Sequence, residues 1–169
     1  MPRGVQHLAP ALARAIPAAV SGDKAWFRMP LGEAGELTLT LVVDAKGKLT
    51  GLEPAKKAEL SKPMRRLARR VSAVLHAGRF AVAEQPGHAG RETYRITIRL
   101  TEGKPIEQDN AEPHHALEFG YDPPIPGTPG RAYFTYASGK HFEAAVTLVS
   151  REVSEEGDEG AGGKQPDAR

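Results

Sequence analysis

The sequence contains no cysteine, which excludes disulfide bonds, thiolate nucleophiles and zinc sites built from cysteine. Aromatic residues make up only 6% of the chain, so it offers few rings on which nucleic-acid bases could stack. No apolar run approaches the roughly 20 residues of a membrane-spanning helix. We therefore expect no transmembrane segment. The chain as written looks cytoplasmic, whereas an anchor or a signal upstream of Met1 would make it periplasmic.

The motifs that mark common enzymes are also missing. Gly139-Lys140 lacks the upstream glycine and the following helix of a phosphate-binding loop, and no serine stands in a G-x-S-x-G pattern. His114 and His115 are adjacent, and adjacent side chains point apart, which makes them poor joint metal ligands. We predict a non-enzymatic protein with no catalytic residue, no metal site and no cofactor.

The charge of the chain is unevenly distributed. Residues 1–100 hold 17 Lys and Arg against 8 Asp and Glu, a net charge of +9, whereas residues 101–169 hold 6 against 13, a net charge of −7. The basic part could meet an acidic partner or the acidic part of the same chain. Two differently solvated surfaces would give the same asymmetry.

Alternating apolar and polar residues predict the first strands. One strand runs from Glu36 to Val43, and the turn Asp44-Ala45-Lys46-Gly47 leads into a partner strand from Lys48 to Glu53. Gly51 in the partner strand suggests a β-bulge. The stretch Arg91 to Leu100 has one apolar and one polar face, which is typical of an antiparallel sheet.

Helical spacing of apolar residues predicts two helices. The first runs from about Val5 to Val20, where Pro10 and Pro17 indicate two shorter pieces or a kink. The second runs from Ser61 to Ala77, with Ser61 as a suitable N-cap.

The C-terminal part is expected to hold a second hairpin. Arg131 to Ala137 and His141 to Val149 flank the turn Ser138-Gly139-Lys140, and an isolated hairpin is barely stable, so it should dock on the first sheet. The predicted fold class is α+β, a small antiparallel β-sheet with helices packed on one face, plus this C-terminal hairpin. The expected division is an α+β domain at 1–104, a Pro/Gly-rich linker at 105–130, the hairpin extension at 131–149 and a disordered acidic tail at 150–169.

The order of these elements resembles the C-terminal domain of the TonB/TolA family over roughly residues 5–100. The strand Gly35 to Asp44, the returning Lys46-Gly47-Lys48-Leu49, the helix at 61–77, the joint Gly78-Arg79-Phe80 and the strand at 91–100 carry the resemblance. The family's small-residue turn before the helix is replaced by Lys56-Lys57-Ala58-Glu59-Leu60.

The resemblance implies a non-enzymatic module that binds a protein partner by adding a strand at a sheet edge, in envelope transport or assembly. The strand at 91–100 is the expected open edge, because its exposed polar face would keep it soluble while its backbone pairs. The residues predicted to bind the partner there are Thr93, Arg95, Thr97 and Arg99.

The basic helix offers an alternative. Five cationic side chains are expected on the side away from its apolar stripe: Lys62, Arg65, Arg66, Arg69 and Arg70. They could grip the phosphates of nucleic acid or an anionic lipid surface. A solvated helix face is the simpler interpretation, since arginine is also a good helix former.

Overall fold

The computed structural model describes residues 3–45, 48–77, 89–125 and 127–154. The helices and strands are α1 (Arg3–Val20), α2 (Lys24–Phe27), β1 (Gly32–Val43), β2 (Leu49–Pro54), a 3-10 turn (Lys57–Glu59), α3 (Lys62–His76), β3 (Ala89–Glu102), β4 (Ala116–Asp122), β5 (Gly130–Tyr136) and β6 (Lys140–Ser154). The fold class is α+β, as the sequence predicts.

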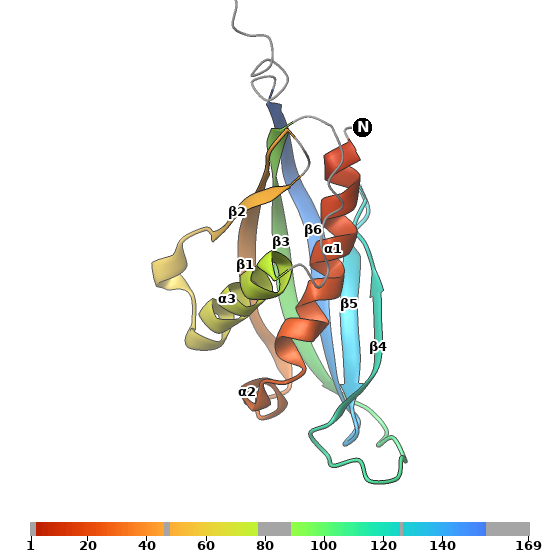
Figure 1. The fold of residues 1–169 in the computed structure, drawn as a ribbon. Coiled ribbons are helices and arrows are strands. Elements are labelled where there is room, and N and C mark those ends of the chain that lie inside the picture. Colours follow the sequence, from red (N-terminus) through yellow and green to blue (C-terminus); the bar gives the residue numbers. More distant parts are fainter. Residues whose placement is uncertain (1–2, 46–47, 78–88, 126, 155–169) are drawn as a thin grey trace, which may run out of the picture.

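The strands form one six-stranded sheet in the order β2-β1-β3-β6-β5-β4, with every neighbouring pair antiparallel (Figure 1). Helices α1 and α3 pack against each other and cover the same face of the sheet. The opposite face of the long central strands is left open to solvent. The molecule therefore has two layers, and both edges of its sheet belong to short strands.

Capping residues and prolines explain where α3 begins and what is unusual about α1. Ser61 caps α3 by accepting a hydrogen bond from the Met64 N–H at 3.4 Å, and Pro63 sits in the first turn, where its missing N–H costs nothing. Pro10 and Pro17 both lie inside α1, yet residues Arg3–Val20 form one helix rather than two. The burial of the apolar face of α1 against the sheet and α3 outweighs the backbone hydrogen bonds that the prolines remove.

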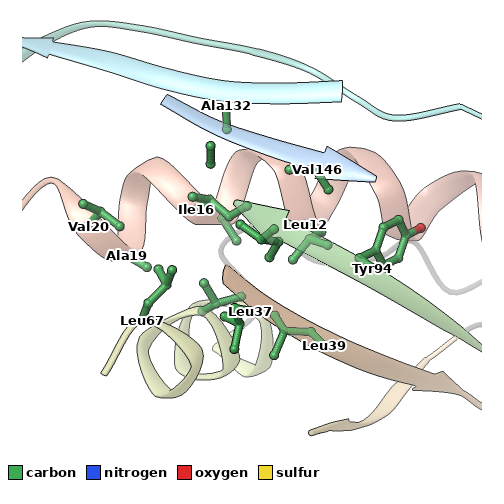
Figure 2. Close-up of a cluster of buried hydrophobic side chains, with 14 of the residues drawn as sticks. Leu12, Ile16, Ala19, Val20, Leu37, Leu39, Leu67, Tyr94, Ala132 and Val146 are labelled. Carbon is green, nitrogen blue, oxygen red and sulfur yellow. The ribbon is translucent and has the colours of Figure 1, made fainter. Parts of the chain in front are cut away.

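The core lies between the helices and the sheet. Leu12 and Ile16 of α1 point toward the strands, and Leu67 of α3 reaches the same cluster (Figure 2). Trp26 of α2 is 1% exposed and packs edge-on against Phe142 of β6, with the ring centroids 5.7 Å apart. Because β6 contributes to this core, the second hairpin belongs to the same hydrophobic unit as the N-terminal elements.

Several boundaries differ from the sequence-based prediction. Residues Ala116–Asp122 of the expected linker form the edge strand β4, and the first residues of the expected tail continue β6 to Ser154. The bulge in β2 falls at Thr50, next to the predicted Gly51. Lys46-Gly47 of the first turn, the joint at 78–80 and residues 155–169 lie outside the described residues.

Candidate partner-binding grooves

The predicted open edge is wrong. Strand β3 pairs with β1 on one side and with β6 on the other, so its backbone hydrogen-bonding groups are already used within the sheet. Strand β6 of the C-terminal hairpin pairs with β3 at this position. The alternation of residues within a strand does not show which strand lies beside it, so the sequence did not predict this pairing. The edge strands of the sheet are β2 and β4.

The side chains predicted to bind at that edge lie on the open face of the sheet and have partners across the strands. The Thr93 hydroxyl is 3.1 Å from the Thr40 hydroxyl. Arg95 lies 3.9 Å from Glu36, and Arg99 lies 3.3 Å from Glu33. Thr97 is exposed opposite Glu36 on β1. These residues therefore stabilise the sheet rather than form an open edge.

Strand β2 is a poor template for a further strand. It has six residues, its ladder with β1 is broken by the bulge at Thr50, and it ends at Pro54, which has no N–H to donate. Short length, bulges and proline are the devices by which proteins protect sheet edges from pairing.

Strand β4 at the opposite edge exposes aromatic residues instead. Phe119 is 54% exposed and Tyr121 is 42% exposed, although both are large and apolar. The Phe119 ring leans on the buried Phe134 of β5, with centroids 5.5 Å apart, which fixes its position at the edge. Exposed aromatic side chains that are held in place are typical of protein-binding surfaces.

The backbone of β4 also offers free pairing groups at its start. The Ala137 N–H donates to the His115 carbonyl at 2.8 Å, and Ala116 lies opposite Tyr136 in register. Because pairs alternate along an antiparallel ladder, the N–H and C=O of Ala116 point away from β5. Glu118, with φ of 53°, forms a bulge after it, so an added strand would pair mainly with this first part of β4.

Two adjoining hollows run between β4 and the C-terminal end of α1, and we call them together the aromatic groove. The first has a volume of about 730 Å³ and the second about 590 Å³. Both are bordered by Ser21 and Phe119, which makes them continuous. The other residues that matter for the argument are Pro17 and Tyr121 in the first hollow, and Phe27, His114 and Tyr136 in the second.

Tyr136 gives the aromatic groove a polar group at its base. Its side chain is 1% exposed, and its hydroxyl has no hydrogen-bond partner within the described part of the chain. Burial raises the pKa of Tyr136, and the nearby Asp23 carboxylate raises it further, so the hydroxyl stays protonated. A buried hydroxyl without a partner costs free energy, and this oxygen is closed to solvent in the structure.

The five predicted cations of helix α3 fall into two groups in the structure. Asp23, which is 6% exposed, accepts hydrogen bonds from Arg66 at 3.1 and 3.2 Å and lies 3.9 Å from Arg70. The same carboxylate caps α2 by accepting from the Ala25 N–H. Two of the five predicted cations therefore have a structural role. The remaining three, Lys62, Arg65 and Arg69, border a hollow of about 480 Å³ between α3 and β2.

The described histidines make separate contacts rather than one cluster. Within the described residues, no group of three or more His, Asp or Glu side chains could hold a metal ion. His115 Nδ1 accepts from the Glu112 N–H at 3.0 Å, and His114 packs edge-on against Phe27. His141 lies 2.9 Å from the Thr135 hydroxyl and 3.4 Å from a Glu143 oxygen, and its ring centroid is 5.8 Å from that of Tyr133.

Sequence reasoning missed Phe119, Tyr121 and Tyr136. The first two fell in a segment assigned to a linker because of the flanking prolines. The spacing of two between Phe119 and Tyr121, in a run favourable to strands, is the signal that could have found them.

Comparison of this chain with protein-family models, with curated proteins and with solved structures finds no match in any of the three. The similarity to the TonB/TolA C-terminal domain therefore stays a prediction from the order of elements. No helix in the described ranges is long and apolar enough to cross a membrane.

Proposed function

We propose that this protein is a non-enzymatic interaction module that binds an extended segment of a partner protein along β4. The observation that carries the proposal is the pair of exposed aromatic residues, Phe119 and Tyr121, on an edge strand that borders the aromatic groove. An edge strand beside a helix is the arrangement in which an extended peptide can pair with the backbone while its side chains enter the groove.

The partner segment is expected to combine backbone pairing with apolar anchors. The free groups of Ala116 supply the first hydrogen bonds. The Phe119 ring and the hollows on either side of it favour apolar or aromatic side chains. The resemblance to the TonB/TolA family supports the same mode of binding and suggests envelope transport or assembly as its setting.

The test is selection of peptides from a random 12-residue library against the full chain, followed by amide chemical-shift mapping with the selected peptide. We expect shifts along Ala116–Asp122 and in the facing part of α1. Phe119→Ala should weaken binding at least tenfold without a change in thermal stability, because the ring is already more than half exposed. Thr97→Ala on the open face serves as the control and should bind normally.

Shifts confined to α3 and β2, or full binding by the Phe119→Ala variant, would overturn the proposal. Tyr136→Phe is a second control. It removes only a hydroxyl that is closed to solvent, so the variant should bind the peptide normally.

A further inference from the structure

The hollow between α3 and β2 lies at the opposite edge of the sheet from the aromatic groove and has a different chemistry. We call it the basic groove. It is lined by Leu52, Pro54, Lys62, Arg65, Arg66, Ala68, Arg69 and Ser72. No carboxylate is among these residues, and of the four cations listed Arg66 is paired with Asp23 from outside the groove.

The cations of the basic groove are spaced to act together. Lys62, Arg65 and Arg69 follow one another at intervals of three and four along α3, which places them on one side of the helix. Within the described residues, none of the three has an ion-pair partner, whereas Arg66 and Arg70 are held by Asp23. Their guanidinium and ammonium groups are therefore available to a ligand.

The floor of the basic groove is apolar. Leu52 and Pro54 line it from β2, and Ala68 lines it from α3, where it is 4% exposed. A ligand that carries only negative charge would leave this floor unused. A ligand with carboxylates around a small apolar residue would match both the rim and the floor.

We infer that the basic groove binds an acidic segment of a partner protein through carboxylates on Lys62, Arg65 and Arg69. The three cations favour a negatively charged ligand. The apolar floor favours a peptide, which can supply an apolar side chain, over a nucleic acid. None of the described residues that line the basic groove is aromatic, so they offer nucleotide bases no ring on which to stack. The planar guanidinium groups of Arg65 and Arg69 can each pair with a carboxylate through two hydrogen bonds.

This inference is independent of strand addition at β4. The edge beside the basic groove carries the bulge at Thr50 and ends at Pro54, so recognition there rests on side chains rather than on backbone pairing. Binding at the basic groove can therefore be tested separately from binding at the aromatic groove.

The test uses the full chain and a fluorescent eight-residue peptide of glutamates with one central leucine, measured by fluorescence anisotropy at two salt concentrations. We expect saturable binding that weakens as salt rises from 50 to 200 mM. The double variant Arg65→Glu and Arg69→Glu should lose at least tenfold in affinity. The control double variant Arg28→Glu and Lys104→Glu changes the net charge equally at exposed positions outside the groove, and it should bind within twofold of the unmodified chain.

Two further binding measurements test whether the apolar floor is used and whether a peptide is preferred over a nucleic acid. Replacement of the central leucine by glycine should weaken binding several-fold if the apolar floor is used. A single-stranded oligonucleotide of the same length should bind more weakly than the peptide. Equal losses in both double variants, no binding at low salt, or stronger binding of the oligonucleotide would each overturn the inference.

Discussion

The Asp23 carboxylate holds the Arg66 guanidinium at 3.1 Å while it also caps the helix α2, so one buried acid joins the α1–α2 turn to α3. This contact explains why a helix rich in arginine is only partly available to ligands. It also fixes α2, whose Trp26 fills the core below β6.

Replacement of Asp23 should be costly. We expect Asp23→Ala to lower the free energy of unfolding by roughly 2–4 kcal/mol, because it removes a helix cap and leaves Arg66 without its partner. Chemical denaturation monitored by Trp26 fluorescence measures the effect. Asp44→Ala, at an intermediate-burial position beyond the end of β1, is the control and should cost less. Equal losses in the two variants would contradict the structural role assigned to Asp23.

Lys140 at the start of β6 forms hydrogen bonds to the backbone at the end of α2. Its Nζ donates to the Phe27 carbonyl at 2.7 Å and to the Met29 carbonyl, and it lies 5.9 Å from the centre of the Phe27 ring. Lys140→Met keeps the apolar stem and removes the donors, so we expect a loss of about 1–3 kcal/mol. Lys104→Met at an exposed position should leave the denaturation midpoint unchanged.

A buried carboxylate makes stability depend on pH. Glu92 is 1% exposed, and burial raises its pKa to about 7, against opposing effects of the Tyr94 hydroxyl at 2.5 Å and of Arg151 at 3.8 Å. Since the folded protein then binds the proton more tightly than the unfolded chain, stability should fall as pH rises from about 4.5 to 7. The contribution of this group alone is on the order of 3 kcal/mol.

Glu92→Gln removes the titration and keeps an oxygen that accepts from Tyr94. We expect its free energy of unfolding to vary less over this pH range than that of the unmodified chain, so the two curves should separate between about pH 4.5 and 7 and run parallel above it. Denaturant titrations at half-unit steps of pH provide the measurement. Parallel curves would show that Glu92 does not titrate in this range.

Gly130 stands where β5 begins beside the end of β4. A Cβ added there would overlap the Asp122 carbonyl and the Pro124 nitrogen, both of which are backbone atoms that cannot rotate away. We expect Gly130→Ala to cost about 1–3 kcal/mol and to detach the end of β4, with loss of amide protection at Asp122, which pairs with Arg131 of β5. Gly22→Ala is the matched control, because an added Cβ there meets nothing within 4 Å.

Much of the fold could be predicted from periodicity. The alternation at Leu37, Leu39 and Leu41 marked a strand with one buried face, and the same pattern predicted β3 and β6. The cap at Ser61 located the start of α3. These signals are local, since each depends on residues that are neighbours in the sequence.

The candidate site could not be predicted in the same way. Phe119 and Ser21 are far apart in the sequence, and they border one groove only because β4 ends the sheet beside the C-terminal end of α1. Likewise, the residues near Arg66 in the sequence do not indicate that Asp23, which is 43 residues away, is its partner.

The sequence by itself determined most of the strands and helices but not β4, and it determined that the sheet is antiparallel and that the chain is rich in cations near Arg65. The tertiary structure decided which strands are edges and which of those cations remain free. The physical reason is that side-chain periodicity reports which face of an element is buried but not which element pairs beside it. The docking of β6 on β3 closed the expected edge, and it left β4 with its exposed aromatic residues at an edge of the sheet.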